Sequence, residues 1–75
     1  MAQRFSVSDP AALGLALREV RQARGLRQED LALAAGVGLR FVGELERGKP
    51  TVRLVETLRV AAALGVQVVV EDPRG

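Results

Sequence analysis

The sequence contains no cysteine and no histidine among its 75 residues, and Lys49 is its only lysine. Without cysteine there is no disulfide and no thiolate metal site, and without histidine the usual general base and zinc ligand are missing. The only serines are Ser6 and Ser8. With so few groups available as nucleophile, base or ligand, we expect neither an enzyme nor a bound metal or other cofactor.

Long apolar runs are also missing. No run reaches the roughly 18 residues of a membrane span, and residues 1–9 lack the apolar segment of a secretory signal. Hydrophobic residues still make up 48% of the chain, enough for a folded core. We therefore expect one small cytoplasmic domain with no membrane partner. Because a domain of this size buries only roughly 60% of its unfolded surface, a second subunit is also expected.

The charge is unevenly distributed along the chain. The net charge is +2, but residues 1–53 hold nine basic against six acidic side chains, whereas residues 54–75 hold two against three. Ten of the 11 basic residues are arginine, whose planar fork fits phosphates and guanine edges. This distribution allows a polyanionic partner such as DNA without demanding one.

Apolar residues at helical spacing predict a series of short helices. Asp9 as cap and Pro10 in the first turn mark the start of the first helix, residues 10–24. Gly25 ends this helix by adopting the left-handed conformation. Residues 28–35 then form a second helix of about two turns.

A third and a fourth helix follow. Gly48 and Pro50 end the third helix, which covers residues 39–47. Thr51 is expected to cap the fourth helix, which ends at Gly65. We expect the buried stripe of the fourth helix to consist of Leu54, Val55, Leu58, Ala61 and Ala62.

The segment after Gly65 differs from the helical part. Residues 66–71 are rich in valine and are followed by Asp72-Pro73, which predicts a β-strand. A lone strand leaves its backbone groups unpaired, and the chain offers no second strand. We therefore expect antiparallel pairing with the same strand of a second copy. The residues expected to be buried by this dimerisation are Val66, Val68, Val69 and Val70.

The second and third predicted helices are joined by the short turn Gly36-Val37-Gly38. Two short helices joined in this way form a helix-turn-helix, in which one helix enters the DNA major groove and the other braces it. The chain thus divides into a loose arm (residues 1–8), a helix-turn-helix DNA-binding domain (residues 9–65) and a dimerisation segment (residues 66–75).

Three linked segments resemble the Xre family of DNA-binding regulators, a class similar to phage lambda-type repressors: GLRQEDLA at 25–32, AGV at 35–37 and ELERGK at 44–49. The block RFVGELERGKPT at 40–51, with a strand after the fourth helix, looks more particularly like HipB-type antitoxins, which pair with a HipA-type kinase toxin. This resemblance implies an all-α, lambda repressor-like domain of four to five short helices with a C-terminal strand that pairs across a homodimer.

The resemblance also implies a function. The protein would be a nucleoid-associated antitoxin that binds double-stranded operator DNA, represses its own operon and neutralises a kinase toxin. Two alternatives remain at this point. One is a stand-alone Xre-type repressor, such as a restriction-modification controller, and the other is a protein-interaction module that does not bind DNA.

The family's functional positions carry over residue by residue. The resemblance implies base reading by Leu39, Arg40, Gly43 and Glu44. It implies phosphate binding by Gln28, Lys49, Thr51 and Arg53. Arg40 can fork onto guanine O6 and N7. Glu44 either accepts from a cytosine amine or only orients an arginine. Arg21 and Glu46 would form an inward-facing salt bridge with a structural role.

Overall fold

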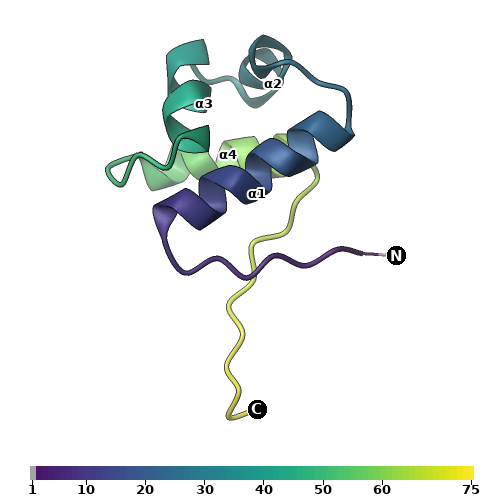
Figure 1. Cartoon of the computed structure of the whole chain (residues 1–75), viewed down its shortest axis with the longest axis vertical. Coiled ribbons are helices and arrows are strands. Elements are labelled where there is room, and N and C mark those ends of the chain that lie inside the picture. The colour runs from purple at the N-terminus through teal and green to yellow at the C-terminus, as the bar shows by residue number, and fades with distance from the viewer. Residues whose placement is uncertain (1) are drawn as a thin grey trace.

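The computed structural model describes residues 2–75, which form four helices and two extended terminal segments (Figure 1). The helices are α1 (Pro10–Ala23), α2 (Gln28–Ala35), α3 (Leu39–Glu46) and α4 (Leu54–Ala63). Helix α2 packs against α3 and α4, and α1 packs against α3. Both terminal segments leave the helical body on the side away from α2 and α3. The expected all-α class is confirmed.

The ends of the first two helices are set by the residues that the sequence indicated. Asp9 Oδ1 accepts a hydrogen bond of 2.7 Å from the Ala12 amide, and Pro10 begins α1. Gly25 follows α1 with a φ of 68°, and Gly36 closes α2 with a φ of 69°. Glycine adopts this left-handed conformation without the steric cost that other residues meet. These predicted boundaries are confirmed.

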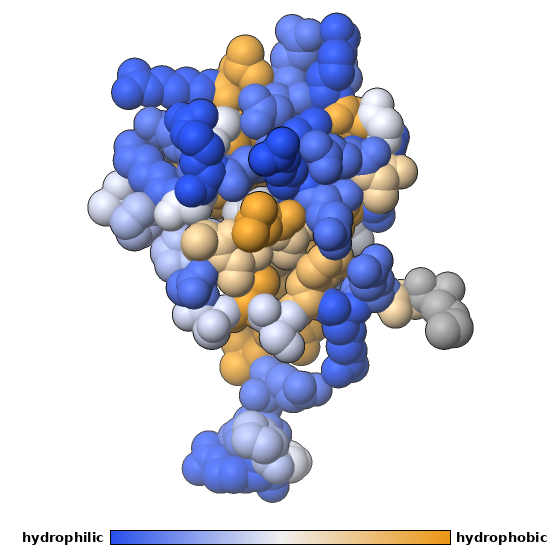
Figure 2. Space-filling view, viewed as in Figure 1, coloured by the Kyte–Doolittle hydropathy of each residue, from blue (hydrophilic) through white to orange (hydrophobic). Residues whose placement is uncertain are grey.

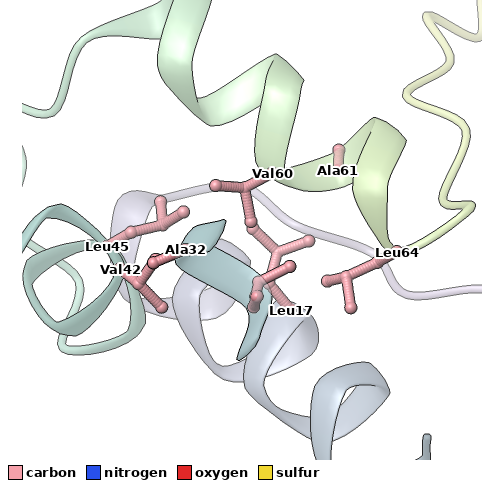
Figure 3. Packing of buried hydrophobic residues seen from close by; sticks show 8 residues of the cluster. Leu17, Ala32, Val42, Leu45, Val60, Ala61 and Leu64 are labelled. Carbon is pink, nitrogen blue, oxygen red and sulfur yellow. The ribbon is translucent and has the colours of Figure 1, made fainter. Parts of the chain in front are cut away.

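The core lies between the four helices and continues just past α4 (Figure 3). Its buried members are Leu17, Leu31, Ala32, Val42, Leu45, Val60, Ala61 and Leu64. On α3, Val42 and Leu45 are both buried. Phe41 and Val37 flank them and are half-buried. The inner side of α3 is therefore fixed, and its opposite side faces solvent.

The predicted start of the fourth helix is wrong. Thr51 does not cap it but lies in an exposed turn, and α4 begins at Leu54 after Arg53 as its cap residue. The Arg53 carbonyl accepts hydrogen bonds from the Thr57 amide (3.0 Å) and the Thr57 hydroxyl (2.8 Å). Val52 packs against the core, which requires an extended chain where a helical turn was expected.

The predicted buried stripe of α4 is also largely wrong. Of its five residues only Ala61 is buried, whereas Leu54 and Val55 are 69% and 63% exposed. The buried side of α4 instead carries Thr57, Val60 and Ala61. Because these positions follow helical spacing as well as the predicted ones do, α4 is apolar on two faces and only one of them meets this chain's core.

The expected β-strand does not form in the single chain. Residues 66–70 are extended, but no strand exists among residues 2–75. Val66 is half-buried against the core, whereas Val68, Val69 and Val70 are exposed. A strand needs a neighbour for its backbone hydrogen bonds, and one copy does not provide it. No helix in the described part of the chain is long and apolar enough to cross a membrane.

Candidate DNA-binding surface

Helices α2 and α3 form one end of the molecule, away from both terminal segments (Figure 1). Residues 36–38 join them through a tight turn, in which the Val37 amide donates to the Ala32 carbonyl at 3.0 Å. Figure 2 shows that hydrophilic residues cover most of this end, while apolar residues gather lower down the same face. The arrangement therefore presents α3 on a polar surface, as entry into the major groove requires.

A buried ion pair holds α3 against α1. Arg21 Nε donates to Glu46 Oε2 at 2.7 Å, and Arg21 Nη2 donates to Glu46 Oε1 at 3.0 Å. Burial acts to raise the pKa of Glu46, but hydrogen bonds from Arg21 and Gln28 keep it below its ordinary value. The hydrogen bond to Glu46 raises the pKa of Arg21, so both groups are charged. The salt bridge expected from the family resemblance is confirmed.

The same ion pair reaches two further parts of the surface. Arg21 Nη1 donates to the Leu26 carbonyl at 2.7 Å, which ties down the loop before α2. Gln28 Nε2 donates to Glu46 Oε1 at 3.0 Å. The first residue of α2, a predicted phosphate contact, is thereby fixed to the last residue of α3. The relative position of α2 and α3 depends on this network.

Gly43 is buried, although it was predicted on the base-reading face. A Cβ added there would lie 3.3 Å from Arg47 Nη1 and 4.0 Å from Gln28 Oε1. The missing side chain therefore makes room for the Arg47 guanidinium beside Gln28. The sequence analysis missed Arg47 as a candidate. Its position four residues after Gly43, one turn along the helix, was the signal that pointed to it.

Leu39, Arg40 and Glu44 lie on the outward side of α3. Leu39 is 52% exposed, and the Arg40 side chain is 89% exposed. Glu44 Oε2 lies 3.4 Å from Arg40 Nε and 3.2 Å from Lys49 Nζ. The hydrogen bond from Lys49 is the main cause that lowers the pKa of Glu44. The structure thus brings two predicted base readers and one predicted phosphate contact into one cluster.

The other predicted phosphate contacts lie between α3 and α4. Thr51 is exposed in the turn, and Arg53 precedes α4. Arg53 Nε pairs with Glu56 Oε1 at 2.7 Å, and its side chain is 79% exposed. The predicted dimerisation residues lie elsewhere, in the segment that leaves the body beyond α4 (Figure 1).

Two short helices joined by a tight turn, with an exposed arginine on the outer side of the second, define a helix-turn-helix DNA-binding protein. A family model described as "Helix-turn-helix domain" matches residues 12–73, and the chain belongs to this family. It is a helix-turn-helix type DNA-binding transcriptional regulator and not an enzyme. The Xre-type resemblance found in the sequence is confirmed.

The chain is similar to several known proteins of this kind. It is 44% identical over 73 residues to an uncharacterised HTH-type transcriptional regulator, y4mF, of Sinorhizobium fredii, covering 97% of this chain and 93% of that protein. The restriction-modification controller protein C.AhdI from Aeromonas hydrophila is 45% identical, with a TM-score of 0.67 over 73% of this chain and 83% of that chain.

HipB in complex with an O4 20mer has a TM-score of 0.83 and covers 91% of this chain and 96% of that chain, at 22% identity. At this identity the likeness shows the fold alone. It confirms the lambda repressor-like fold that the resemblance implied.

Proposed function

We propose that this protein is a dimeric repressor that binds the operator of its own operon, and that it is the antitoxin partner of a HipA-type kinase. The observation that carries the proposal is the exposed outer side of α3, which presents Arg40 at the polar end of the molecule. An α-helix on such a surface fits the major groove, where each base pair shows its own pattern of donors and acceptors.

In the proposed complex, the α3 face that carries Leu39, Arg40, Gly43 and Glu44 lies against the bases. Arg40 forks onto a guanine, and Leu39 contacts a thymine methyl group. Gly43 has no side chain to offer, and its part is to leave room for the Arg47 guanidinium. Specificity therefore depends mainly on Arg40.

Phosphate contacts supply much of the affinity. They come from Gln28, Lys49, Thr51 and Arg53, on both sides of α3. Gln28 also lies at the N-terminus of α2, where free amide groups favour an anion. We add Arg47 to this set, because its guanidinium lies beside Gln28 over Gly43.

Dimerisation is proposed because the chain leaves two apolar surfaces uncovered. One is the outer face of α4, with Leu54, Val55 and Leu58, and the other is the valine segment at residues 66–70. Antiparallel pairing of this segment between two copies would supply the missing strand partner. Two recognition helices related by a twofold axis would then read a near-palindromic operator with half-site centres about 34–36 Å apart, or a multiple of that.

The antitoxin role rests on the extent of the likeness to HipB. Solved HipB structures match 89–95% of this chain, and one of them is a complex of HipA, HipB and O2–O3. The second candidate is a stand-alone repressor or restriction-modification controller. Its support is the 45% identity to C.AhdI. The third candidate is a protein-interaction module that does not bind DNA, and no observation specifically supports it.

The DNA-binding part is tested by fluorescence anisotropy with DNA from the protein's own promoter. We expect tight binding that weakens steeply with salt, and loss of sequence preference in Arg40→Ala with non-specific binding retained. Arg59→Ala is the matched control, an exposed arginine on α4. If the protein shows no salt-sensitive binding to this DNA, the interaction-module alternative replaces the proposal.

The antitoxin part needs a separate test. The protein is co-expressed with a kinase-like protein encoded by a neighbouring gene, and the complex is purified by size-exclusion chromatography. A stable complex that suppresses kinase activity supports the antitoxin role. Operator binding without any such complex supports the stand-alone repressor.

A further inference from the structure

We propose that Glu44 is a positioning residue that holds Arg40 and Lys49 at the DNA-facing surface and does not itself read a base. The inference rests on the operator binding proposed above and assigns a role within that site. It decides between two roles that the sequence left open, an acceptor for a cytosine amine and an orienting partner for an arginine.

One carboxylate oxygen of Glu44 lies near two cationic side chains. Glu44 Oε2 is the atom closest to both cations, at 3.4 Å from Arg40 Nε and 3.2 Å from Lys49 Nζ. The Glu44 side chain is 20% exposed, whereas that of Arg40 is 89% exposed. Arg40 therefore extends further into solvent than Glu44. To reach a base edge, Glu44 would have to leave two cations at once.

The nitrogen of Arg40 that pairs with Glu44 is Nε. A guanine is read through two parallel hydrogen bonds to O6 and N7, which requires two coplanar N–H donors. Glu44 lies closest to Nε, and none of the hydrogen bonds described for residues 2–75 uses the two terminal nitrogens that would form this fork. Because Arg40 and Glu44 are one helical turn apart, the carboxylate limits the rotamers of a long, exposed side chain. Less conformational freedom is then lost when the guanine is bound.

The negative charge of Glu44 also affects how Lys49 attracts DNA. A carboxylate beside Lys49 offsets part of the charge that would otherwise attract any phosphate. Non-specific DNA binding comes almost entirely from such contacts, whereas base reading does not. Glu44 therefore lowers binding to unrelated DNA while it improves the reading of the operator. Both effects raise the ratio of specific to non-specific affinity.

The experiment compares Glu44→Gln, Arg40→Ala and the double variant on the operator, on operators changed at each base pair, and on unrelated DNA. Glutamine keeps the shape of the side chain and removes its charge. Arg40→Ala should lower discrimination at its guanine by about 5- to 150-fold. Glu44→Gln should lower discrimination at that same base pair by about two- to fivefold, the range of an exposed ion pair.

Two further results are expected from the positioning role. In the Arg40→Ala background, Glu44→Gln should leave base preference unchanged, because no arginine remains to be oriented. Glu44→Gln should also tighten binding to unrelated DNA and steepen its salt dependence, by up to about one phosphate contact. Glu44→Gln combined with Lys49→Ala should abolish this gain. Circular dichroism checks that each variant is folded.

The reverse pattern would overturn the inference. A base reader would show its loss at a different base pair from Arg40, and the loss would persist in the Arg40→Ala background. Arg40→Ala could leave all base preferences intact while the parent protein still binds its operator. That result would refute the positioning role of Glu44 and leave the proposed operator binding unaffected. If the parent protein binds no operator DNA, both proposals fall.

Discussion

Replacing Glu46 with leucine would remove the carboxylate that the buried Arg21 guanidinium contacts through Nε at 2.7 Å and Nη2 at 3.0 Å. Removing one partner of a buried pair costs about 3–5 kcal/mol, because the other charge is left without compensation. At about 0.05–0.15 kcal/mol per residue, a domain of 75 residues has a free energy of unfolding of roughly 4–11 kcal/mol. Glu46→Leu should therefore remove a large part of the stability.

The double variant Arg21→Met, Glu46→Leu separates stability from DNA binding. It contains no buried charge, so its stability should return to near that of the parent protein. The Leu26 carbonyl loses its donor, which limits the recovery by about 1–3 kcal/mol. Gln28 also loses its acceptor on α3. We therefore expect weaker operator binding in a protein that is again folded.

Thermal and urea denaturation followed by circular dichroism measure these effects. For a domain of this size the single variant should lower Tm by at least about 12 °C. All proteins are compared at one concentration, because an oligomer's apparent stability depends on it. A loss below about 1 kcal/mol for Glu46→Leu would refute the structural role of the pair. A double variant that is no more stable than the single one would refute the argument from an uncompensated charge.

The pKa of Glu46 is lowered in the folded state, so the ionised carboxylate adds to the free energy of unfolding above its unfolded pKa of about 4.3. This stabilisation is lost as the pH falls through the folded pKa. Urea midpoints measured against pH should therefore fall less steeply in acid for Glu46→Gln than for the parent protein. Gly14→Ala would press a Cβ against the carbonyl oxygens of Leu45 and Glu46 and should lower the free energy of unfolding in urea by about 1–3 kcal/mol, whereas Gly38→Ala, which meets open space, should not. Deleting residues 66–75 should give monomers in sedimentation that bind a half-site weakly, and an intact dimer would contradict the proposed strand pairing.

Local signals in the sequence were sufficient for most helix boundaries. The start of α1 follows from one carboxylate and one proline, and its end from Gly25. Residues 28–35 were predicted as the second helix, and α2 has the same bounds. A cap or a left-handed glycine acts within one helical turn, so the residues that decide the boundary are neighbours in the chain.

The start of α4 was not predictable in the same way. Thr51 is a good cap by its chemistry, and the residues after it suit a helix. Val52, however, packs against the core and keeps the chain extended up to Arg53. Because this contact depends on how the helices assemble into the core, it leaves no local signal.

The candidate site was predictable by type but not by arrangement. The family resemblance assigned Arg40 to base reading, and the structure exposes its side chain on α3. The clustering of Arg40 and Lys49 on one oxygen of Glu44 depends on how the loop after α3 turns back. The position of Arg47 depends on an absent side chain at Gly43. Side-chain contacts across a loop or over a glycine do not follow from residue type alone.

The predicted burial of the apolar stripe on α4 is wrong for one chain, and the strand expected at residues 66–70 does not form there. The pairing of that segment was predicted between two copies and stays a prediction. A helix that is apolar on two faces is typical of an element covered on both, and contiguous exposed apolar surface marks an interaction site. Both patterns are satisfied if a second copy covers α4 and pairs with residues 66–70. The proposed dimer would therefore account both for the exposed apolar residues of α4 and for the strand that one chain does not form.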